Sequence, residues 1–370
     1  MMRTLLLGAA LLAPLLAQNP RPPSNSPSVS NSVSNKEFDL QPGIGWINTA
    51  IDLQPGDSVH FDASGSLRYS NAKQFNGPEG LPRGFKDLIR DLPFDDAGRG
   101  ALVGRIGSSE ADRSFLIGRE LDKKALIAGR LYLGINERPK DKATGSYHVT
   151  IVRTAALAVT NAAPVRLPEF PQSALDSIPL RVSDRSGGLG DRVNFILIGS
   201  NTQIQAMLKA AGWVQVDSSK KAALVEVFHE SMSKEAYVSL PMSELRLFGR
   251  PQDFGYAQGD PIRVVASRHH FRLWRAPFQL GEQDVWVGAG THDIGFNRNH
   301  HDELITHKID PDTDNERDYI RDSLTQTGAV LETTYLKPTH PILIGKTATG
   351  EEFYSDGRTL LLYLAPAPSN

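Results

Sequence analysis

Histidine is concentrated in one part of this 370-residue chain. Six of the ten histidines lie between His269 and His307, a window of 39 residues, which is far more than even spacing would place there. Imidazole is a common metal ligand and exchanges protons near neutral pH, so clustered histidines are typical of metal sites and of acid–base sites. This window is therefore where the sequence predicts chemistry.

Strand parity selects a subset of these side chains. Alternating apolar residues predict strands over 263–274, 284–294 and 303–310. Within each strand one polar side chain shares a face with apolar neighbours: His269 in the first, Asp293 in the second and His307 in the third. If the strands form a meander, these three side chains point to the same apolar side. A register slip of one residue would exchange His269 for His270.

This set of residues suits two kinds of chemistry. Two imidazoles and one carboxylate could hold a divalent metal ion with open positions, and a histidine–aspartate pair could act as acid and base. A third interpretation is structural, because a buried polar group must be hydrogen-bonded whatever its role. A fourth is a binding pocket without chemistry. His292 falls on the other face of its strand. The candidate catalytic residues are His269, His270, Asp293 and His307.

Acidic residues alternate directly after the third strand. Asp310, Asp312 and Asp314 have the spacing that opens a calcium-binding EF-hand loop. The sixth position, Asn315, and the twelfth, Arg321, do not fit such a loop. The pattern therefore favours an acidic helix start, in which Asp312, Thr313 or Asp314 caps the helix. The alternative keeps the three carboxylates as a weak metal site that Asp310 links to the histidine cluster.

Two domains must position these residues. Residues 37–153 consist of short alternating strands with turn residues between them, which is typical of an all-β sandwich or jelly roll. Residues 181–370 combine an apolar strand, amphipathic helices over 202–213, 219–232 and 315–328, and further strands, which predicts an α+β domain. Residues 154–180 carry four prolines and predict a linker.

The N-terminus predicts export. Residues 1–17 place one basic residue before a short apolar run that ends at a small residue, which is typical of a signal peptide. Residues 18–36 are rich in serine and proline and predict a disordered linker. We therefore expect a secreted or periplasmic protein.

Composition argues against several partners. The chain has no cysteine, which excludes disulfides and a lipid anchor on cysteine. The formal charge of -2 and the absence of a long basic run argue against nucleic acid. No second apolar stretch reaches the ~20 residues that cross a bilayer, so we expect no integral membrane span in the mature protein.

The first domain resembles a known family. The motifs Gly-Trp-Ile-Asn-Thr (45–49), Pro-Gly-Asp (55–57), GALVGRIG (100–107) and GRLYLGINE (129–137) are similar, in order and spacing, to the LecA-type galactose-binding lectins. The resemblance covers nearly the whole domain. It implies a β-sandwich that holds a calcium ion between two loops, with sugar hydroxyls completing the shell of the ion.

The calcium loop departs from the pattern of that family. Glu137 stands where the resemblance implies an aspartate, and Lys142 and Ala143 stand where it implies two amides. We therefore expect calcium-dependent galactose binding to be impaired. Altered glycan binding and a purely structural or protein-binding role are the alternatives. The binding candidates of this degraded loop are Tyr69, Glu137, Asp141 and Thr144.

The second domain resembles another family. Leu-Phe-Gly-Arg-Pro-Gln-Asp (247–253), Arg-His-His-Phe-Arg-Leu-Trp (268–274) and Thr-His-Lys-Ile-Asp-Pro-Asp-Thr-Asp-Asn-Glu-Arg-Asp (306–318) look like the LssY C-terminal domain. The match covers residues 180–365. It implies a fold without an established activity.

Two hypotheses about function follow. In the first, an exported protein performs a hydrolytic or metal-dependent reaction in its histidine-rich domain, and the lectin-like domain holds it to a glycan or another envelope component. In the second, the protein is a non-catalytic glycan- or protein-binding adhesion protein, and the same polar residues stabilise its core.

Overall fold

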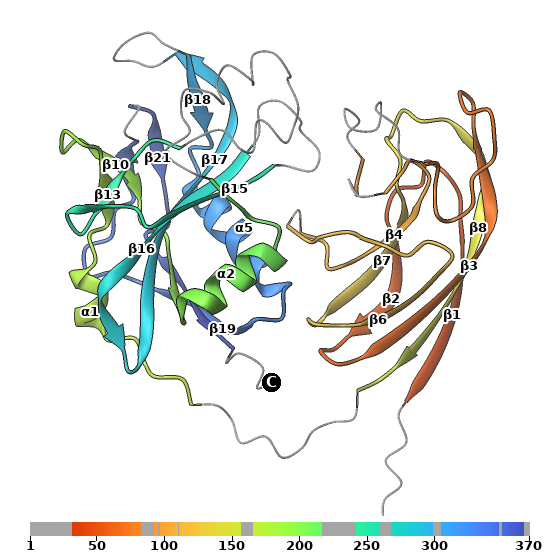
Figure 1. The fold of residues 1–370 in the computed structure, drawn as a ribbon, viewed down its shortest axis with the longest axis horizontal. Coiled ribbons are helices and arrows are strands. Elements are labelled where there is room, and N and C mark those ends of the chain that lie inside the picture. Colours follow the sequence, from red (N-terminus) through yellow and green to blue (C-terminus); the bar gives the residue numbers. More distant parts are fainter. Residues whose placement is uncertain are drawn as a thin grey trace, which may run out of the picture.

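The chain forms two β-rich bodies that lie side by side (Figure 1). The computed structural model describes residues 32–82, 92–94, 97–109, 111–156, 166–216, 242–259, 268–298, 305–347 and 350–365. The predicted signal peptide, most of the serine/proline linker and the predicted helix over 219–232 lie outside these residues. A β-rich chain with several sheets is confirmed, while the α+β class of the second domain stays a prediction.

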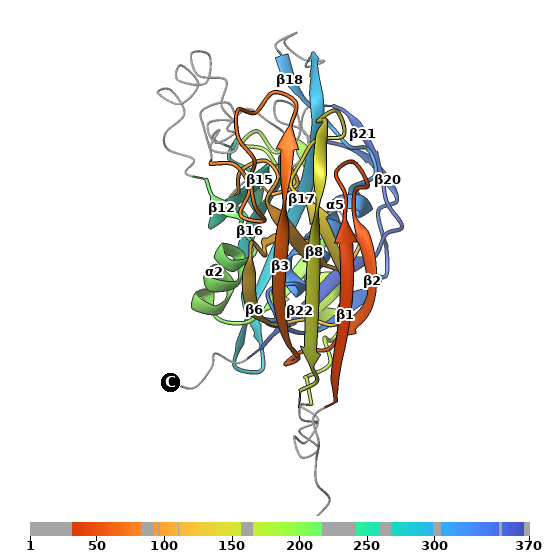
Figure 2. The same ribbon diagram turned by 90° about the vertical axis from the view of Figure 1, so that its right-hand side faces the viewer.

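Two four-stranded sheets enclose the core of the first domain. The first sheet contains, in order, β1 (Val33–Leu40), β8 (Ala143–Thr154), β3 (Ser58–Tyr69) and β6 (Glu120–Lys124); Figure 2 shows β1, β8 and β3 side by side. The second contains β2 (Ile47–Leu53), β7 (Gly129–Ile135), β4 (Leu102–Ile106) and β5 (Phe115–Leu116). Alternate side chains of both sheets are buried and meet in one apolar core, which includes Phe61, Leu133 and Tyr147.

A large mixed sheet organises the second domain. Its strands are, in order, β12 (Val214–Gln215), β15 (Phe254–Gly259), β16 (Arg268–Leu280), β17 (Gln283–Arg298), β11 (Phe195–Ile198), β22 (Thr359–Leu364) and β19 (Val330–Leu336), and β18 (Ile305–Ile309) pairs with β17. Strands β11 and β22 are parallel, and β16 and β17 form a long antiparallel hairpin. Strands β11 and β22 are almost continuously apolar, which is the pattern of strands that are buried on both faces.

Helices cover one face of this sheet. Helix α2 (Asn201–Ala210) begins with a capping box of Ser200 and Gln203, and helix α5 (Thr313–Thr325) begins at Asp312, whose carboxylate accepts from Asp314 N. Figure 1 shows both helices on the side of the sheet that faces the first domain. No helix of the described residues is long and apolar enough to cross a membrane.

Small elements cover the other face of the sheet, and one of them lies within the predicted linker over 154–180. They are α1 (Gln172–Ser177), the sheet β10 (Leu189–Arg192), β9 (Arg181–Ser183), β13 (Arg246–Leu247), β14 (Arg250–Pro251), and the hairpin β20 (Ile344–Lys346), β21 (Glu352–Tyr354). Phe170, Leu175 and Ile178 belong to the core of the second domain. The part of 154–180 from Phe170 onward is therefore folded rather than connecting, because its apolar residues pack under the sheet.

The last turns of α5 contact the first domain. Ser109 Oγ donates to Asp322 Oδ2 over 2.9 Å, and Arg113 N donates to the side chain of Gln326 over 2.6 Å. Gln326 in turn donates to Ala111 O. One helix thus belongs to the core of the second domain and holds a loop of the first.

Candidate functional site

The register of β16 and β17 decides which polar side chains meet. His269 lies opposite His292, His270 opposite Thr291 and Arg268 opposite Asp293. Residues directly opposite each other in an antiparallel pair point to the same face. His269 and His292 therefore share the face covered by α5, and Asp293 points to the other face.

The expectation that His269 and Asp293 share a face is thus wrong. Parity within each strand was assigned correctly, but apolar neighbours do not identify a common face when both faces of the sheet are buried. Phe271 follows His269 into the core under the helices, whereas Ala289 on the Asp293 side packs into the core under α1 and the small sheet.

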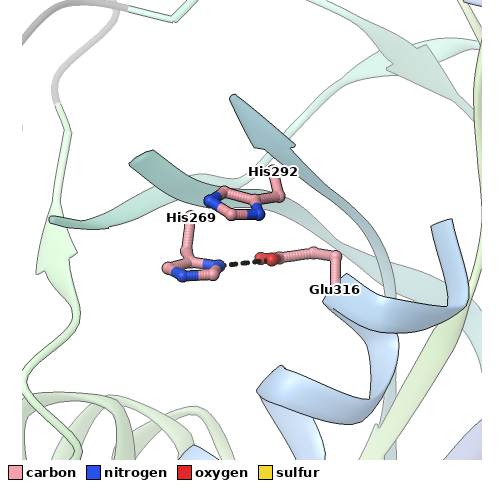
Figure 3. A group of neighbouring side chains, drawn as sticks. All are labelled: His269, His292 and Glu316. Atoms are coloured by element: carbon pink, nitrogen blue, oxygen red, sulfur yellow. Dashed lines mark hydrogen bonds and ion pairs between the residues drawn. The ribbon is translucent and has the colours of Figure 1, made fainter. Parts of the chain in front are cut away.

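The face under α5 carries a group of three ligand-type side chains. Glu316 extends from the first turn of α5 toward His269 and His292, as Figure 3 shows. His269 Nδ1 lies 2.5 Å from Glu316 Oε2, and one ligand atom from each of the three residues lies within 4.8 Å of the others. Gly290 permits this approach, because a Cβ there would lie 2.5 Å from the Ile320 side chain. We call His269, His292 and Glu316 the helix-side triad.

A stack of rings fixes the orientation of the first histidine. The His269 ring lies parallel to the Tyr319 ring with 3.5 Å between centroids, and its other neighbour, His292, stacks at 4.0 Å. The Tyr319 hydroxyl donates to Gln258 Oε1 over 3.2 Å, which holds the tyrosine in place. His269 and Glu316 are buried, whereas His292 is half-buried and forms the more exposed side of the triad.

Glu316 is a buried carboxyl that the surrounding residues do not fully satisfy. Its side chain is 1% exposed, and its Oε1 accepts no hydrogen bond in the described structure. Burial raises the pKa of Glu316 well above its ordinary value, and the negative charges of Asp293 and Asp310 raise it further. A cation beside Glu316 would relieve both the burial and the repulsion.

The opposite face of the same strands carries a separate hydrogen-bonded group. Thr291 Oγ1 lies 2.9 Å from His270 Nε2, and His270 Nδ1 lies 3.6 Å from Asp293 Oδ2, which also lies 3.4 Å from Arg268 Nε. Burial raises the pKa of Asp293 to about 7, although Arg268 lowers it. The structure therefore brings His270, rather than His269, to Asp293. All four side chains are buried, which is the environment of a structural network.

The remaining candidates of the second domain lie around this site. His307 is in β18 opposite Phe296, and its side chain lies outside the described residues. Asp310 donates its backbone N–H to His292 O over 2.8 Å, which places its carboxyl near the helix-side triad. Asp312 caps α5, as one of the two interpretations predicted. Asp314 Oδ1 accepts from Arg317 and Ser355, so protein donors already occupy it.

The loop candidates of the first domain are also occupied by protein donors. Glu137 accepts from Gly43 N over 2.6 Å and from the Tyr69 hydroxyl over 2.8 Å. Asp141 accepts from Arg138 over 2.9 Å and lies 3.5 Å from Arg99. Thr144 lies exposed in β8, away from these contacts.

A buried arginine supplies the positive charge of this loop. Arg99 stacks 4.2 Å from the centre of the Tyr69 ring and donates to Asn71 over 2.9 Å. Burial raises the pKa of Asp141, but hydrogen bonds from Arg138 and the charges of Arg138 and Arg99 outweigh it and leave the pKa lowered. The guanidinium groups thus neutralise the acid that the loop retains.

Sequence reasoning missed two members of the helix-side triad. The sequence predicts His292 on the face opposite to that of the candidates. Glu316 was treated as part of an acidic helix start. A signal was present, because Glu316, Ile320 and Leu324 are four residues apart on one face of α5 and all three are buried. An acid on the apolar stripe of an amphipathic helix is a candidate for a buried site.

Comparisons with known proteins found a family and a solved structure that are similar to parts of this chain. The family described as "LssY C-terminus" matches residues 175–359, half of the chain. A solved structure described as "EclA N-terminal domain; PllA-like lectin" is similar at 23% identity, covering 32% of this chain and 94% of that chain with a TM-score of 0.24. None of the curated proteins matches the chain.

Proposed function

This chain belongs to the family of the LssY C-terminus, and we propose that His269, His292 and Glu316 of its second domain bind one divalent transition-metal ion that serves a hydrolytic reaction. Two imidazoles and one carboxylate are a common donor set for such ions, and three protein ligands leave room for water or substrate. Of these ions, we expect zinc to be the one that the site binds.

The unsatisfied oxygen of Glu316 is the observation that carries this proposal. A buried carboxyl without a full set of hydrogen bonds costs free energy, and proteins retain such groups where a ligand satisfies them. Oε2 already contacts His269, so Oε1 is the atom left for an ion. The additional charge of Asp310 makes the place more favourable for a cation.

The neighbouring residues would prepare the site for such an ion. Tyr319 packs on His269 and fixes the plane of that ring, so it is a positioning residue. His292 is the most exposed of the three ligands, so substrate would approach from its side. When bound, the ion would lower the pKa of a coordinated water toward neutrality and thereby supply a nucleophile for hydrolysis.

Metal analysis of the purified full chain tests this proposal. We expect one ion per chain and saturable zinc binding by calorimetry after removal of metal with a chelator. His292→Ala and Glu316→Gln should each weaken binding roughly 100-fold or more, since loss of a ligand exceeds the effect of an outer-shell partner. His60→Ala is a matched control, because His60 also contacts a carboxylate, Asp122, but on the surface of the first domain.

Two results would contradict the proposal at different levels. Wild-type protein that binds no zinc, manganese or iron would remove the metal site. Protein that binds metal through these residues but hydrolyses neither chromogenic esters nor phosphodiesters, whether metal-free or reloaded, would leave a metal-binding domain without the proposed reaction.

We also propose that the protein acts outside the cytoplasm, with the first domain as an accessory binding module. This rests on the predicted signal peptide over 1–17 and on the predicted resemblance of the first domain. Expression in a bacterial host, followed by fractionation and N-terminal sequencing, tests the first part. A mature N-terminus at or near Gln18 in the exported fraction is expected, and an intact Met1 in the cytoplasm would contradict export.

A further inference from the structure

A cavity of about 410 Å³ lies in the first domain, apart from the helix-side triad. It is bounded by the segment before β2, by the loop after β4 and by the loop after β7. Ile44, Trp46, Pro93 and Ile135 give it an apolar wall. This volume is within the usual range for small-molecule sites, which are mostly apolar with a few polar groups.

Arg105 is one of the charged residues that line this cavity. It lies on β4 opposite Tyr132, and its guanidinium is 4.5 Å from the centre of the Trp46 ring and 5.3 Å from that of Tyr132. Its Nε is buried without a hydrogen-bond partner, and none of the described residues forms an ion pair or hydrogen bond with its side chain. A guanidinium carries five N–H donors, so this one has unused capacity for an acceptor.

The other charged groups around the cavity each have a hydrogen-bond partner in the protein. Glu137 accepts from Gly43 and Tyr69, and Asp112 Oδ2 accepts from Ser109 N over 2.6 Å. Arg138 donates to Asp141. Among the described lining residues, Arg105 is thus the cation whose side chain contacts two aromatic rings and makes no hydrogen bond or ion pair, although the charge of Asp112 acts on it. A negatively charged acceptor is the ligand group that it would recognise.

We propose that this cavity binds a small ring-bearing carboxylate. The carboxylate would receive two parallel hydrogen bonds from the Arg105 fork, the geometry that guanidinium groups favour. The ring would lie against the apolar wall formed by Trp46, Pro93 and Ile135. Ser108 and Ser114 also line the cavity and offer hydroxyls to polar substituents of the ring. The ring and the charge are both required, because either one alone uses only half of the site.

Four probes separate these requirements. Glucuronate and benzoate each carry a ring and a carboxylate, methyl glucoside carries the ring alone, and acetate carries the charge alone. Calorimetric titration of the full chain should show saturable binding of glucuronate, benzoate or both. Methyl glucoside and acetate should bind more weakly. Preference for glucuronate would identify an acidic sugar as the ligand, and preference for benzoate would identify an aromatic acid.

Variants connect the binding to this cavity. Arg105→Gln should lower the affinity for the ring carboxylate at least about tenfold, since it removes charge-assisted hydrogen bonds. Arg105→Lys keeps the charge without the fork and should fall between wild type and Arg105→Gln. Arg130→Gln is the matched control, because Arg130 lies on neighbouring β7 and already pairs with Asp52.

Thermal melting and tryptophan fluorescence accompany the titrations. The chain has four tryptophans, and Trp46 is the one that lines the cavity, so a ligand-induced change in emission that is lost in Trp46→Phe reports ligand there. Thermal melting identifies a variant that fails to fold. Wild-type protein that binds neither ring carboxylate overturns the proposal. So does acetate binding as tightly as they do, or a folded Arg105→Gln protein with wild-type affinity.

Discussion

The two domains each bury an acidic side chain, but they treat it differently. In the first domain Asp141 lies between Arg138 and Arg99, and these cations leave its pKa lowered despite burial. In the second domain Glu316 is buried beside two histidines and near further acids, and its pKa is raised. Burial of a carboxyl is therefore not by itself a sign of function; what distinguishes the two is whether the protein supplies the compensating charge.

Removing the internal cation of the first domain should have the largest effect. Arg99→Met leaves Asp141 buried with one fewer partner, and we expect a loss of about 3–5 kcal/mol in the free energy of unfolding. Urea unfolding followed by tryptophan fluorescence, with a Trp46→Phe background to identify the signal of the first domain, measures it. The control Arg119→Met removes an exposed ion pair with Glu79 and should cost at most about 1 kcal/mol. Calcium that restores the stability of Arg99→Met would show instead that the loop still binds a metal ion.

The corresponding change in the second domain should have the opposite sign. Glu316→Gln replaces an unsatisfied acid by a neutral amide, and the metal-free protein should gain about 1–3 kcal/mol near pH 8. The pKa of Glu316 is higher in the folded protein than in the unfolded chain. In the wild type, the protonated acid therefore contributes its full share to the free energy of unfolding below the unfolded pKa, and this contribution is lost as the pH rises through the folded pKa.

Unfolding curves of both proteins at several pH values measure this difference. The advantage of Glu316→Gln should shrink toward pH 4.5 and disappear when zinc is bound to the wild type. An advantage that is independent of pH would contradict the assignment of a raised pKa to Glu316.

The affinity for metal should itself depend on pH. Because ligation requires ionised Glu316 and neutral histidines, zinc affinity should rise with pH by up to about tenfold per unit for each proton released, and then level off. Calorimetry in buffers of different ionisation enthalpy counts the released protons. Binding without proton release would contradict ligation by Glu316. No such dependence is expected for Asp141, whose pKa is lowered.

Asp112 is a third, half-buried acid, and it has both a nearby cation and a nearby acid. We expect its ionisation to have the smallest of these effects, on the affinity of the proposed ligand. The pKa of Asp112 is raised to about 6, because burial and the repulsion from Asp322 outweigh the lowering by the Ser109 N–H and by Arg105. As pH rises through 6, ionised Asp112 competes with a ligand carboxylate for Arg105. The affinity of the proposed ring carboxylate should then fall roughly two- to five-fold, as expected for a partly screened charge. Calorimetry at pH 5 and 7.5 measures the change, and Asp112→Asn should abolish it.

Much of the architecture could be predicted from the sequence. Alternation and turn residues indicated the strands of the first domain, and helical spacing indicated α2 and α5. The histidine window led to β16 and β17, which do carry the candidate site. These features are local, so they follow from the periodicity of a single segment.

The pairing of the candidates could not be predicted in the same way. Which residue of β17 lies opposite His269 depends on the hairpin geometry and on an irregularity between Arg275 and Gln279, and neither is visible in strand parity. Glu316 reaches the sheet because Gly290 lets α5 approach closely, which is a contact between segments far apart in the chain. The role of Arg99 likewise depends on loops that meet only in the folded domain.

Helix α5 gives the molecule a mechanical connection between its domains. Glu316 and Asp322 are six residues apart, about 9 Å along the axis at ~1.5 Å per residue. The first residue belongs to the helix-side triad and the second receives the hydrogen bond from Ser109. A straight helix does not change length under small forces, so a displacement at one end moves the other. Metal binding at the start of α5 and docking of the first domain on its end are therefore linked equilibria. By thermodynamic linkage, the free energy by which metal binding changes the docking equals the free energy by which docking changes metal binding.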